Sequence, residues 1–437
     1  MNRIDRSILR IAVPSIVVNI TTPLLSLMDV TFTGHMGSAT YLAAIAVGGT
    51  IFNMIYWIFG FLRMGTSGIT AQAYGRSTTS SCSDGRAEVT ASLLRGLAIA
   101  AIAGLIIILL RHPIAAAGLD IMDVDGDTAA STLRYFLILS AGAPAVLATY
   151  VFTGWLIGMQ DSRSPMWMSL TINVVNIAVS FALVVGLGMK IEGVAVGTLV
   201  AQWTGCLMGA VIIWRRHRPA SVTLSRVWDA AAMKKFFRVN SDIFLRTLCL
   251  VGVTVWFTRA GASAGTVTLA VNALLMQFFY FFSYFMDGFA FAGEALTGRY
   301  TGAHDRDGLR SVIKALLRWG LMLGVVFSIV YMAAGTVAVD LLTSETAVRE
   351  ASREYMAWIV TVPLAGFAAF TFDGIFIGAT MTRAMLASMF AAMITYFAAY
   401  FLLTPFMGNH ALWLAFVLYL AVRGGVLGLM SPRLLKL

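Results

Sequence analysis

Long apolar segments recur along the whole chain, and they limit its possible folds more than any other feature. A helix needs about 20 apolar residues to cross the hydrocarbon core of a bilayer, and runs of that kind follow one another from end to end. The 437 residues are 59% hydrophobic and only 12% charged, whereas about 25% of the residues of a soluble protein are charged. Strand-length segments of alternating polarity, which are typical of membrane β-barrels, are absent from the sequence. We therefore predict an all-α polytopic membrane protein.

The apolar segments form two sets of six, separated by a polar and basic segment from Arg215 to Arg238. We expect twelve transmembrane helices, near residues 8–32, 43–68, 89–110, 131–157, 165–187, 192–214, 238–259, 269–297, 310–334, 353–378, 384–404 and 410–430. The predicted organisation is an N-terminal lobe of residues 1–214, a cytoplasmic linker of residues 215–237 and a C-terminal lobe of residues 238–437.

Basic residues are distributed unequally between the loops on the two sides of the membrane. The termini and the even-numbered loops hold 22 lysines and arginines, and the other loops hold 6. Because basic loops stay in the cytoplasm, we expect both termini and the linker there, with the protein in the inner membrane of the cell. The net charge of +10 then reflects topology, and we expect no nucleic-acid partner.

A weak internal repeat relates the two halves. The segment FTGWLIGMQDSR, Phe152–Arg163, matches FDGIFIGATMTR, Phe372–Arg383, at a spacing of 220 residues. Two more matches occur at spacings of 223 and 227, namely Leu93–Arg95 with Leu316–Arg318, and Thr70 and Gly75 with Thr297 and Gly302. Because each half has an even number of spans, the lobes are predicted to share one orientation about a pseudo-twofold axis along the membrane normal. Transporters built in this way bind substrate between their halves.

The first predicted span contains the carboxylate of Asp29 and two prolines, Pro14 and Pro23. A charged side chain within the bilayer costs about 2.5–3.5 kcal/mol on insertion scales, so an intramembrane acid is a candidate functional group. Each proline removes a helical hydrogen bond and favours a bend. A titratable group on a bendable helix fits a proton-driven switch. The alternative is that Asp29 caps the helix at the membrane surface.

The second half carries more ionisable groups within its spans. Asp242 and Arg246 are four residues apart with the acid first, which predicts a structural ion pair along one helix. Asp287 and Glu294 are two helical turns apart on one face, so we expect them to line one cavity. The alternative for Glu294 is a place at the cytoplasmic mouth of that cavity.

Asp373 lies in the repeated segment, where the first half has the neutral Thr153. The two halves are therefore chemically unequal. Burial disfavours the charged form of a carboxylate, so a buried acid can hold its proton until a cationic ligand or water reaches it. That property is the physical requirement for exchanging protons against cations.

Polar and aromatic side chains extend the candidate cavity. Asn173 and Asn176 in the fifth span either bond to neighbouring helices or share a cavity with Asp29. The segment MQFFYFFSYFMDGFAF, Met276–Phe291, gathers methionine and aromatic side chains around Asp287. Such side chains suit an adaptable apolar cavity for flat cations, although helix packing and lipid contact explain most of them.

No pattern in the sequence indicates an enzyme. The five histidines lie in loops or at helix ends without metal-ligand spacing, and the three cysteines are far apart. The sequence has neither a phosphate-binding loop nor a nucleophile elbow. We therefore expect no catalytic residue, no metal and no cofactor, and we exclude transport driven by ATP hydrolysis in this chain.

Two long segments resemble the multidrug and toxic compound extrusion (MATE) transporters, most closely the DinF branch. They are LMDVTFTGHMG, Leu27–Gly37, with the following Tyr41–Gly75, and FFSYFMDGFAFAGEALTGRYTGA, Phe281–Ala303. The similarity extends from Arg6 to the last span. It implies twelve helices in two six-helix lobes around a central cavity. It also implies export of cationic and amphipathic compounds in exchange for protons or sodium.

The resemblance also assigns roles to single residues. Asp29 matches an acid of the first helix that is implicated in proton coupling, and Pro14 resembles the proline at which that helix bends. Asp373 resembles the acid of the tenth helix that binds cations in the NorM branch. Relatives often have an acid four residues after the asparagine of the fifth helix, whereas Asn176 is followed by Ser180. This difference disfavours a sodium site in the N-terminal lobe.

We therefore expect a secondary active multidrug-type efflux antiporter that works by alternating access, with Asp29 as its proton-coupling residue. The other candidate site residues are Asn173, Asn176, Ser180, Asp287, Glu294 and Asp373 in the cavity, with Pro14 and Pro23 at the bend of the first helix. The expected partners are small-molecule substrates, protons or else sodium ions, and the lipid bilayer around a monomer.

Three alternatives stay open. One is a sodium-coupled exporter of the same family, and another is a flippase for lipid-linked precursors. A flippase usually has a strongly basic cavity, whereas acids outnumber bases within these spans by five to three. A membrane-embedded enzyme would need a clustered nucleophile, metal or His–acid pair, and the sequence has none.

The unequal distribution of basic residues predicts that the linker faces the cytoplasm. A cysteine introduced at Ser225 should resist a membrane-impermeant maleimide in intact cells and react after the cells are opened. Labelling of this cysteine from outside intact cells would contradict the topology. A cysteine in the opposite set of loops, at Asp123, is the matched control and should react in intact cells.

Overall fold

The computed structural model describes residues 3–34, 39–79, 83–124 and 126–436, with all of their side chains except those of residues 22, 24–34, 39, 83 and 84. The described chain is almost entirely helical and contains no strand. This result confirms the predicted all-α fold. In a bilayer a helix satisfies every backbone hydrogen bond within one segment, which is why apolar segments of this length become helices.

Among the residues that the structure describes, nine α-helices form in the first half. They are α1 (Arg3–Gly34), α2 (Ala39–Ile58), α3 (Phe61–Thr79), α4 (Ser83–Leu109), α5 (Arg111–Ile121), α6 (Gly126–Ser140), α7 (Ala143–Gly158), α8 (Arg163–Phe181) and α9 (Ile191–Ile212). Short π-helical turns follow α8 at Ala182–Gly186 and α9 at Ile213–His217.

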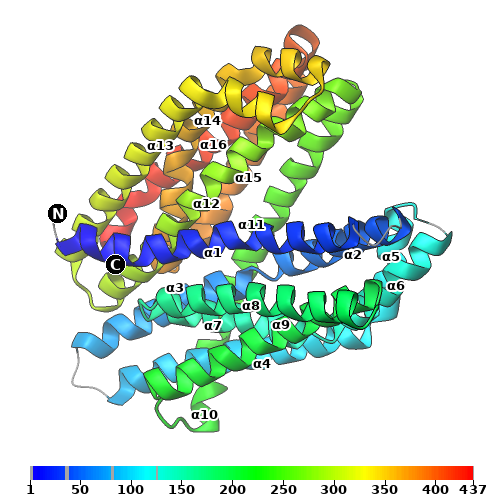
Figure 1. Ribbon diagram of the computed structural model, residues 1–437. Helices are drawn as coiled ribbons and strands as arrows, with labels where there is room; N and C mark the ends of the chain where they lie inside the picture. The colour runs from blue at the N-terminus through cyan, green and yellow to red at the C-terminus, as the bar shows by residue number, and fades with distance from the viewer. Residues whose placement is uncertain (1–2, 35–38, 80–82, 125, 437) are drawn as a thin grey trace. The chain divides into compact units, whose positions relative to one another are not determined.

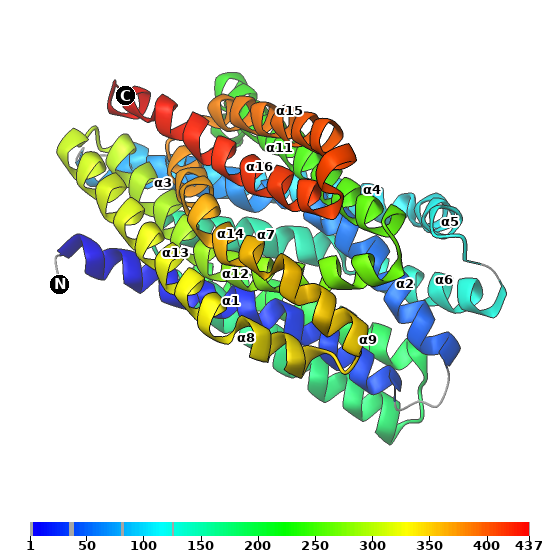
Figure 2. The same cartoon turned by 90° about the horizontal axis from the view of Figure 1, so that it is seen from above.

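The remaining helices are the short α10 (Leu224–Val227), then α11 (Ala230–Ser263), α12 (Thr266–Gly302), α13 (Arg306–Leu342), α14 (Thr346–Gly378), α15 (Thr382–Met407) and α16 (Asn409–Met430), with a 3₁₀ turn at Ser431–Lys436. Figure 2 shows α15 and α16 lying side by side, in agreement with their extensive packing.

Ten helices within the described residues are long and apolar enough to cross a membrane, or eleven if one bent pair is a single span. The first predicted span, 8–32, falls within α1. The second predicted span is broken between α2 and α3 near Gly60. The fourth consists of α6 and α7, which meet at an angle of 52°. Pro144 in the first turn of α7 explains this bend, because proline has no N–H to continue the hydrogen bonds of α6.

The described chain forms two compact units. Unit 1 holds Met1–Ile16 and Phe237–Leu437, and unit 2 holds Val17–Phe236. The long helix α1 therefore contributes its first turns to unit 1 and its remainder to unit 2 (Figure 1). The change from one unit to the other comes two residues after Pro14, which is itself buried.

The same close contact between helix backbones occurs in each unit. In unit 2 a Cβ atom on Gly154 of α7 would overlap with the carbonyl oxygen of Arg63 on α3. In unit 1 a Cβ atom on Gly374 of α14 would overlap with the carbonyl oxygen of Ala290 on α12. Small residues allow helices to approach this closely within a membrane. These two contacts fix which faces of the paired helices meet.

The contact continues one helical turn later in both units. A Cβ atom on Gly158 would lie 2.7 Å from the Ser67 carbonyl oxygen, and one on Gly378 would lie 2.5 Å from that of Glu294. The glycines are 220 residues apart in the two units and their partners are 227 apart. These are the spacings of the internal repeat in the sequence. The repeat therefore preserves the same helix-to-helix contact.

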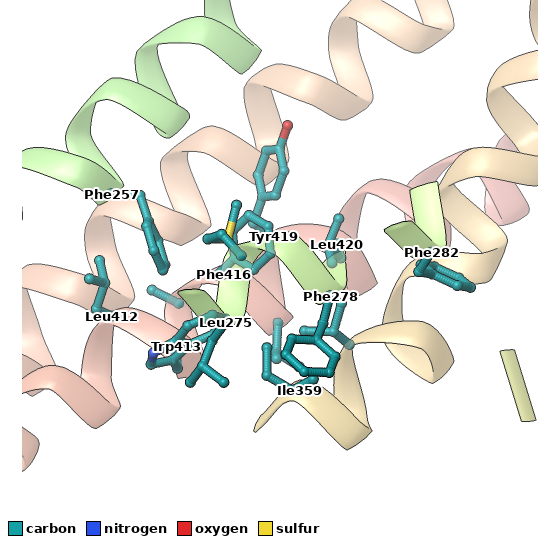
Figure 3. Packing of buried hydrophobic residues seen from close by; sticks show 14 of the residues in the cluster. Phe257, Leu275, Phe278, Phe282, Ile359, Leu412, Trp413, Phe416, Tyr419 and Leu420 are labelled. Carbon is teal, nitrogen blue, oxygen red and sulfur yellow. The ribbon is translucent and has the colours of Figure 1, made fainter. Parts of the chain in front are cut away.

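Aromatic side chains fill the core of unit 1. Phe257 of α11 lies 5.1 Å from Trp413 and 5.5 Å from Phe416 of α16, measured between ring centroids (Figure 3). The first of these contacts is edge-to-face, and such contacts add about 0.5–1.5 kcal/mol to the energy of burial. The hydroxyl of Tyr331 on α13 donates to the carbonyl oxygen of Phe278 on α12 at 2.7 Å. The core of unit 2 is a separate cluster of buried apolar side chains, which come from helices between α2 and α9 and from the turn after α9.

The loop between α7 and α8 is tied to the end of α9 through Asp161. Its carboxylate accepts from the Ser164 hydroxyl at 2.7 Å, bonds to His217 at 3.1 Å and lies 3.4 Å from Arg216. Burial raises the pKa of Asp161, but the bonds with His217 and Ser164 and the charge of Arg216 outweigh burial and lower that pKa to about 2. The stabilisation is therefore complete above pH about 4 and is lost only as the pH falls toward 2.

Two arginines that are related by the internal repeat each hold a segment at the start of one half. Arg95 on α4 is 2% exposed. It donates to Glu88 at 2.7 Å and to the carbonyl oxygens of Arg226 and Val227 in the linker at 2.7 and 2.8 Å. The counterpart of Arg95 in the repeat is Arg318 on α13, which pairs with Asp5 near the start of α1. Each of these two arginines thus anchors a segment at the start of one half.

We predict that Arg95→Ala destabilises the protein more than Arg318→Ala does. Breaking the buried Arg95 pair should cost about 3–5 kcal/mol, whereas the more exposed Arg318 pair is worth at most about 1 kcal/mol. Thermal unfolding of the purified variants, followed by tryptophan fluorescence, measures the difference. Arg86→Ala, at an exposed arginine on α4, is the control and should leave the melting temperature unchanged. Equal shifts for Arg95→Ala and Arg318→Ala would contradict this view of the two anchors.

Candidate functional site

The polar residues predicted in the fifth span lie on α8, and the structure gives them partners in unit 2. The side-chain amide of Asn173 donates to the carbonyl oxygen of Thr21 on α1 at 3.1 Å. The Thr21 hydroxyl lies 3.0 Å from that of Ser169, one turn earlier on α8. Two bonds therefore join α8 to the part of α1 that precedes Asp29. They favour the interhelical role for Asn173 over a role in a cavity.

Asn176 and Ser180 lie one turn apart on α8 and face α9. The Asn176 amide donates to the Thr198 hydroxyl at 2.8 Å, and Ser180 packs against Gly197, whose missing side chain leaves room for the serine hydroxyl. Both residues are completely buried. The carbonyl oxygen of the Asn176 side chain and the Ser180 hydroxyl have no hydrogen-bond partner. This pair is thus a neutral polar site inside unit 2.

Asp29, the predicted coupling residue, lies in α1, and its side chain is outside the described residues. Pro14 and Pro23 also lie in α1, which continues through both prolines. The turn around Pro14 is in close contact with α12, because a Cβ atom on Gly288 would overlap with Ile16 and lie 2.9 Å from the Ala12 carbonyl oxygen. Gly288 directly follows Asp287. The first turns of α1 are thereby fixed to unit 1.

Three buried charged side chains meet in unit 1. The Oδ2 atom of Asp373 on α14 accepts hydrogen bonds from both Arg246 on α11 and Arg423 on α16. The three residues are between 3% and 6% exposed. The guanidinium group of Arg423 also lies 5.6 Å from the centre of the Phe370 ring. We call Arg246, Asp373 and Arg423 the charge cluster.

The charge cluster overturns one prediction from the sequence. Arg246 does not pair with Asp242, four residues earlier on α11, but with Asp373 on another helix. Asp242 instead accepts a hydrogen bond from the Thr382 hydroxyl at 2.7 Å. The prediction of an ion pair along α11 is wrong because a helical spacing favours such a pair by only about 0.2–0.5 kcal/mol. A buried guanidinium gains far more from a carboxylate that is fully buried with it.

Asp287 and Glu294 lie on α12 as expected, but in different surroundings. Asp287 is half-buried and acts electrostatically on both arginines of the charge cluster. Glu294 is 1% exposed, and its backbone is in contact with Gly378 of α14. Glu294 is therefore buried within the helix packing.

A cavity of about 210 Å³ opens between α11 and α12 in unit 1. Its lining residues are Thr254, Phe257, Thr258, Leu269, Asn272, Ala273, Met276, Gln277 and Tyr280. Part of the predicted aromatic and methionine segment thus does line a cavity. The polar end of the lining is fixed by Asn272, which exchanges hydrogen bonds with Asn409 at 2.8 and 3.0 Å and accepts from Trp413 at 2.9 Å.

The MatE family model matches residues 14–182 and 243–402 of this chain. The chain belongs to the MatE family. Members of this family are transporters, so the protein is a multi-pass membrane transporter and not an enzyme. The matched residues include α8 with Asn173 and Asn176 and two members of the charge cluster, Arg246 and Asp373.

Several known MATE proteins are similar to this chain. It is 36% identical over 423 residues to the DNA damage-inducible protein F of Escherichia coli (strain K12), and this match spans 96% of this chain and 90% of that protein. It is 22% identical over 372 residues to the probable multidrug resistance protein NorM of Thermotoga maritima, across 80% of this chain and 75% of that protein. The predicted membership of the MATE family, in its DinF-like branch, is therefore confirmed.

Solved structures show the same MATE fold. The Vibrio cholerae MATE transporter VcmN in the bent form has a TM-score of 0.87 and 18% sequence identity, over 99% of this chain and 97% of that one. The predicted twelve-helix fold agrees with this likeness.

Sequence reasoning named Arg246 and Asp373 and counted Arg423 only as one of three basic residues within the spans, and it did not predict their association. Arg423 stood out only as an ionisable residue within a span, and its partner lies 50 residues away on another helix. The available signal was a count of charges. Two arginines in the spans of the second half, at positions 246 and 423, require buried acids, and Asp373 is the acid in the repeated segment Phe372–Arg383.

We predict that Asp373→Ala is severely destabilising in this MATE protein, whereas Asp242→Asn is mild. Loss of the Asp373 carboxylate leaves two buried arginines without their partner and should cost about 3–5 kcal/mol. An asparagine at position 242 still accepts from the Thr382 hydroxyl. The yield of monodisperse protein and its melting temperature measure both effects. Equal behaviour of the two variants, or no gain in stability when Arg423→Ala is added to Asp373→Ala, would contradict the charge cluster as described.

Proposed function

We propose that this transporter is a proton-coupled antiporter that exports cationic or amphipathic small molecules by alternating access, with Asp29 as the coupling residue. The observation that carries the proposal is the division of α1 between the two units directly after Pro14. Asp29 lies on the part that belongs to unit 2. A change of charge on a helix that contributes to both units provides a physical way to bias their conformational equilibrium.

The contacts of α1 support this role. Its first turns are held in unit 1 by the close packing of Gly288 on the turn around Pro14 and by Asp5, which pairs with Arg318 and accepts from Trp319 at 3.1 Å. Its later part is held in unit 2 through Thr21, which contacts Asn173 and Ser169. Pro14 and Pro23, which lie on either side of the change between the units at Ile16 and Val17, have no backbone N–H to donate to the helix. Bending is therefore easiest there.

The surroundings of Ser180 support protons over sodium as the coupling ion. Ser180 takes the place of an acid in the expected sodium site and is buried against Gly197. One observation favours the sodium-coupled alternative, since the oxygen atoms of Asn176 and Ser180 without a hydrogen-bond partner are both potential cation ligands. Two neutral oxygens offer a cation less than a carboxylate does, so we favour the proton.

Asp373 fits a structural role better than the cation-binding role suggested by the resemblance to the NorM branch. Two arginines already share its Oδ2 atom, and they would repel an added cation. For the rest of the organisation we propose a monomer in the inner membrane, with both termini and the linker of residues 215–237 in the cytoplasm. The linker divides the lobes of residues 1–214 and 238–437.

We predict that Asp29→Asn abolishes coupled efflux in a folded protein. Asparagine keeps the size and hydrogen-bonding capacity of a protonated aspartate but cannot ionise. The proton then has no differential affinity for the two conformations and cannot shift them. Efflux of a cationic dye from proteoliposomes under a pH gradient should fall about tenfold or more. Asp242→Asn is the matched control and should retain efflux. A wild-type rate for Asp29→Asn would show that Asp29 is an interfacial cap.

A second prediction concerns the driving force. Dye efflux from proteoliposomes should persist without sodium and stop when the pH gradient is collapsed. The reason is that Ser180 supplies no negative charge to hold a sodium ion. Sodium-dependent efflux that survives collapse of the pH gradient would establish the alternative instead. Ser180→Ala should leave proton-driven efflux unchanged, because it removes only an oxygen atom.

A further inference from the structure

The cavity between α11 and α12 is lined by one face of each helix. Its lining on α11 consists of Thr254, Phe257 and Thr258, and its lining on α12 recurs every three or four residues from Leu269 to Tyr280. Residues with this spacing lie on one side of a helix. The stripe on α12 extends over eleven residues, which is about 16 Å along the helix axis. The cavity is therefore an elongated groove between two helices of unit 1.

The lining of this cavity is uncharged. None of its nine residues, all of them within the described chain, is an acid or a base. Arg259 directly follows Thr258, but its guanidinium group lies 5.6 Å from the centre of the Trp256 ring. On α12 the next acid, Asp287, comes seven residues after Tyr280, about 10 Å along the axis. An ion without a partner is costly among apolar groups, so the lining favours an uncharged ligand.

The two threonines of the lining offer acceptors to a ligand. The Thr254 hydroxyl donates to the carbonyl oxygen of Leu250 at 3.0 Å, and the Thr258 hydroxyl donates to that of Thr254 at 3.2 Å. A hydroxyl group has one proton and two lone pairs. The protons of both threonines are thus used within α11, whereas their oxygen atoms can accept. Gln277 and Tyr280 on the opposite side can donate or accept. A ligand that matches the threonines must supply donors.

The core of unit 1 holds the walls of the cavity in place. The Phe257 ring lies 5.1 Å from that of Trp413 and 5.5 Å from that of Phe416 (Figure 3). Asn272 is fixed by its bonds with Asn409 and Trp413. A preformed lining reduces the entropy that binding costs. An engineered cavity of about 150 Å³ binds benzene, so a cavity of about 210 Å³ has room for one ring with small substituents.

We propose that the cavity between α11 and α12 is a subsite for an uncharged aromatic ring that carries hydrogen-bond donors, as a phenol does. The ring lies against Phe257 and Met276, and its hydroxyl groups donate to the oxygen atoms of Thr254 and Thr258. The proposal rests on the transport function proposed above and adds a substrate class to it, namely amphipathic compounds with a neutral phenolic part. A cationic ring is disfavoured because no acid lines the cavity.

The test measures binding of resorcinol, a neutral benzene ring with two hydroxyl groups, to the full-length protein in nanodiscs. Saturation-transfer NMR follows the binding, and empty nanodiscs give the background. We expect saturable binding that catechol displaces. Phenyltrimethylammonium, which is charged, and 1,3-dimethoxybenzene, which has no donor, should displace resorcinol about tenfold less effectively, since each lacks both hydrogen bonds to the threonines.

Variants of the threonines test where resorcinol binds. Thr254→Val and Thr258→Val each remove one acceptor and keep the branched shape of the side chain, so each should weaken resorcinol binding about threefold or more. Thr361→Val on α14 is the matched control and should bind like the wild type. The Thr361 hydroxyl also donates to a carbonyl oxygen four residues earlier, that of Ala357 at 2.8 Å, but Thr361 is exposed outside the cavity.

A second pair of variants tests the cavity itself. Ala273 lies in the middle of the stripe on α12, so Ala273→Leu should fill the groove and abolish resorcinol binding. Ala270→Leu makes the same change one turn earlier, at an exposed alanine that does not line the cavity, and should leave binding unchanged. Equal binding by these two variants would contradict the proposed place of the ring.

The outcomes separate this proposal from the proposed function. Wild-type binding by the double variant of Thr254→Val and Thr258→Val, or equal displacement by catechol and phenyltrimethylammonium, would overturn the subsite. The displacement comparison uses only the wild type, so it holds even if a variant is unstable. Efflux of a cationic dye under a pH gradient is measured separately. A wild type that exports dye but does not bind resorcinol refutes the subsite alone, and one that binds resorcinol but exports no dye refutes the antiport alone.

Discussion

Each unit depends on the close approach of two helix backbones at a pair of glycines. Gly154 of α7 rests on the backbone of α3, and Gly374 of α14 rests on that of α12. In lipid the hydrophobic effect does not bring helices together, so close van der Waals contact between small residues takes its place. A side chain at either glycine would collide with a carbonyl oxygen rather than with a flexible side chain. The repeat has a glycine at each of these positions, where a larger residue would force the two backbones apart.

The two units use this shared scaffold for different chemistry. Directly before Gly374, unit 1 has Asp373, which binds two arginines, whereas unit 2 has Thr153 directly before Gly154. The buried polar pair of unit 2, Asn176 and Ser180, is neutral. The shared helix contact therefore does not dictate the chemistry of the residues beside it.

The sequence was sufficient for the helices, the repeat and the family, but not for the partners of the charged side chains. The length of each apolar segment and the 220-residue spacing of the repeat can both be read along the chain without knowing which helices pack together. The structure agrees with both. The pairing of Arg246 depends on how α11, α14 and α16 pack, and helical spacing wrongly favoured Asp242. The bend before α7 was readable from Pro144, whereas the break near Gly60 was not, because a single glycine is tolerated in many helices.

The most direct test of the account is a measurement of proton release when substrate binds. Purified protein in a weakly buffered solution with a pH-sensitive dye is mixed with a cationic substrate, and the change in pH is followed. If Asp29 holds a proton that the substrate displaces, the wild type should release protons in proportion to the substrate bound. Asp29→Asn should release none, while Asp242→Asn should behave like the wild type. Proton release that is unchanged in Asp29→Asn would contradict the account.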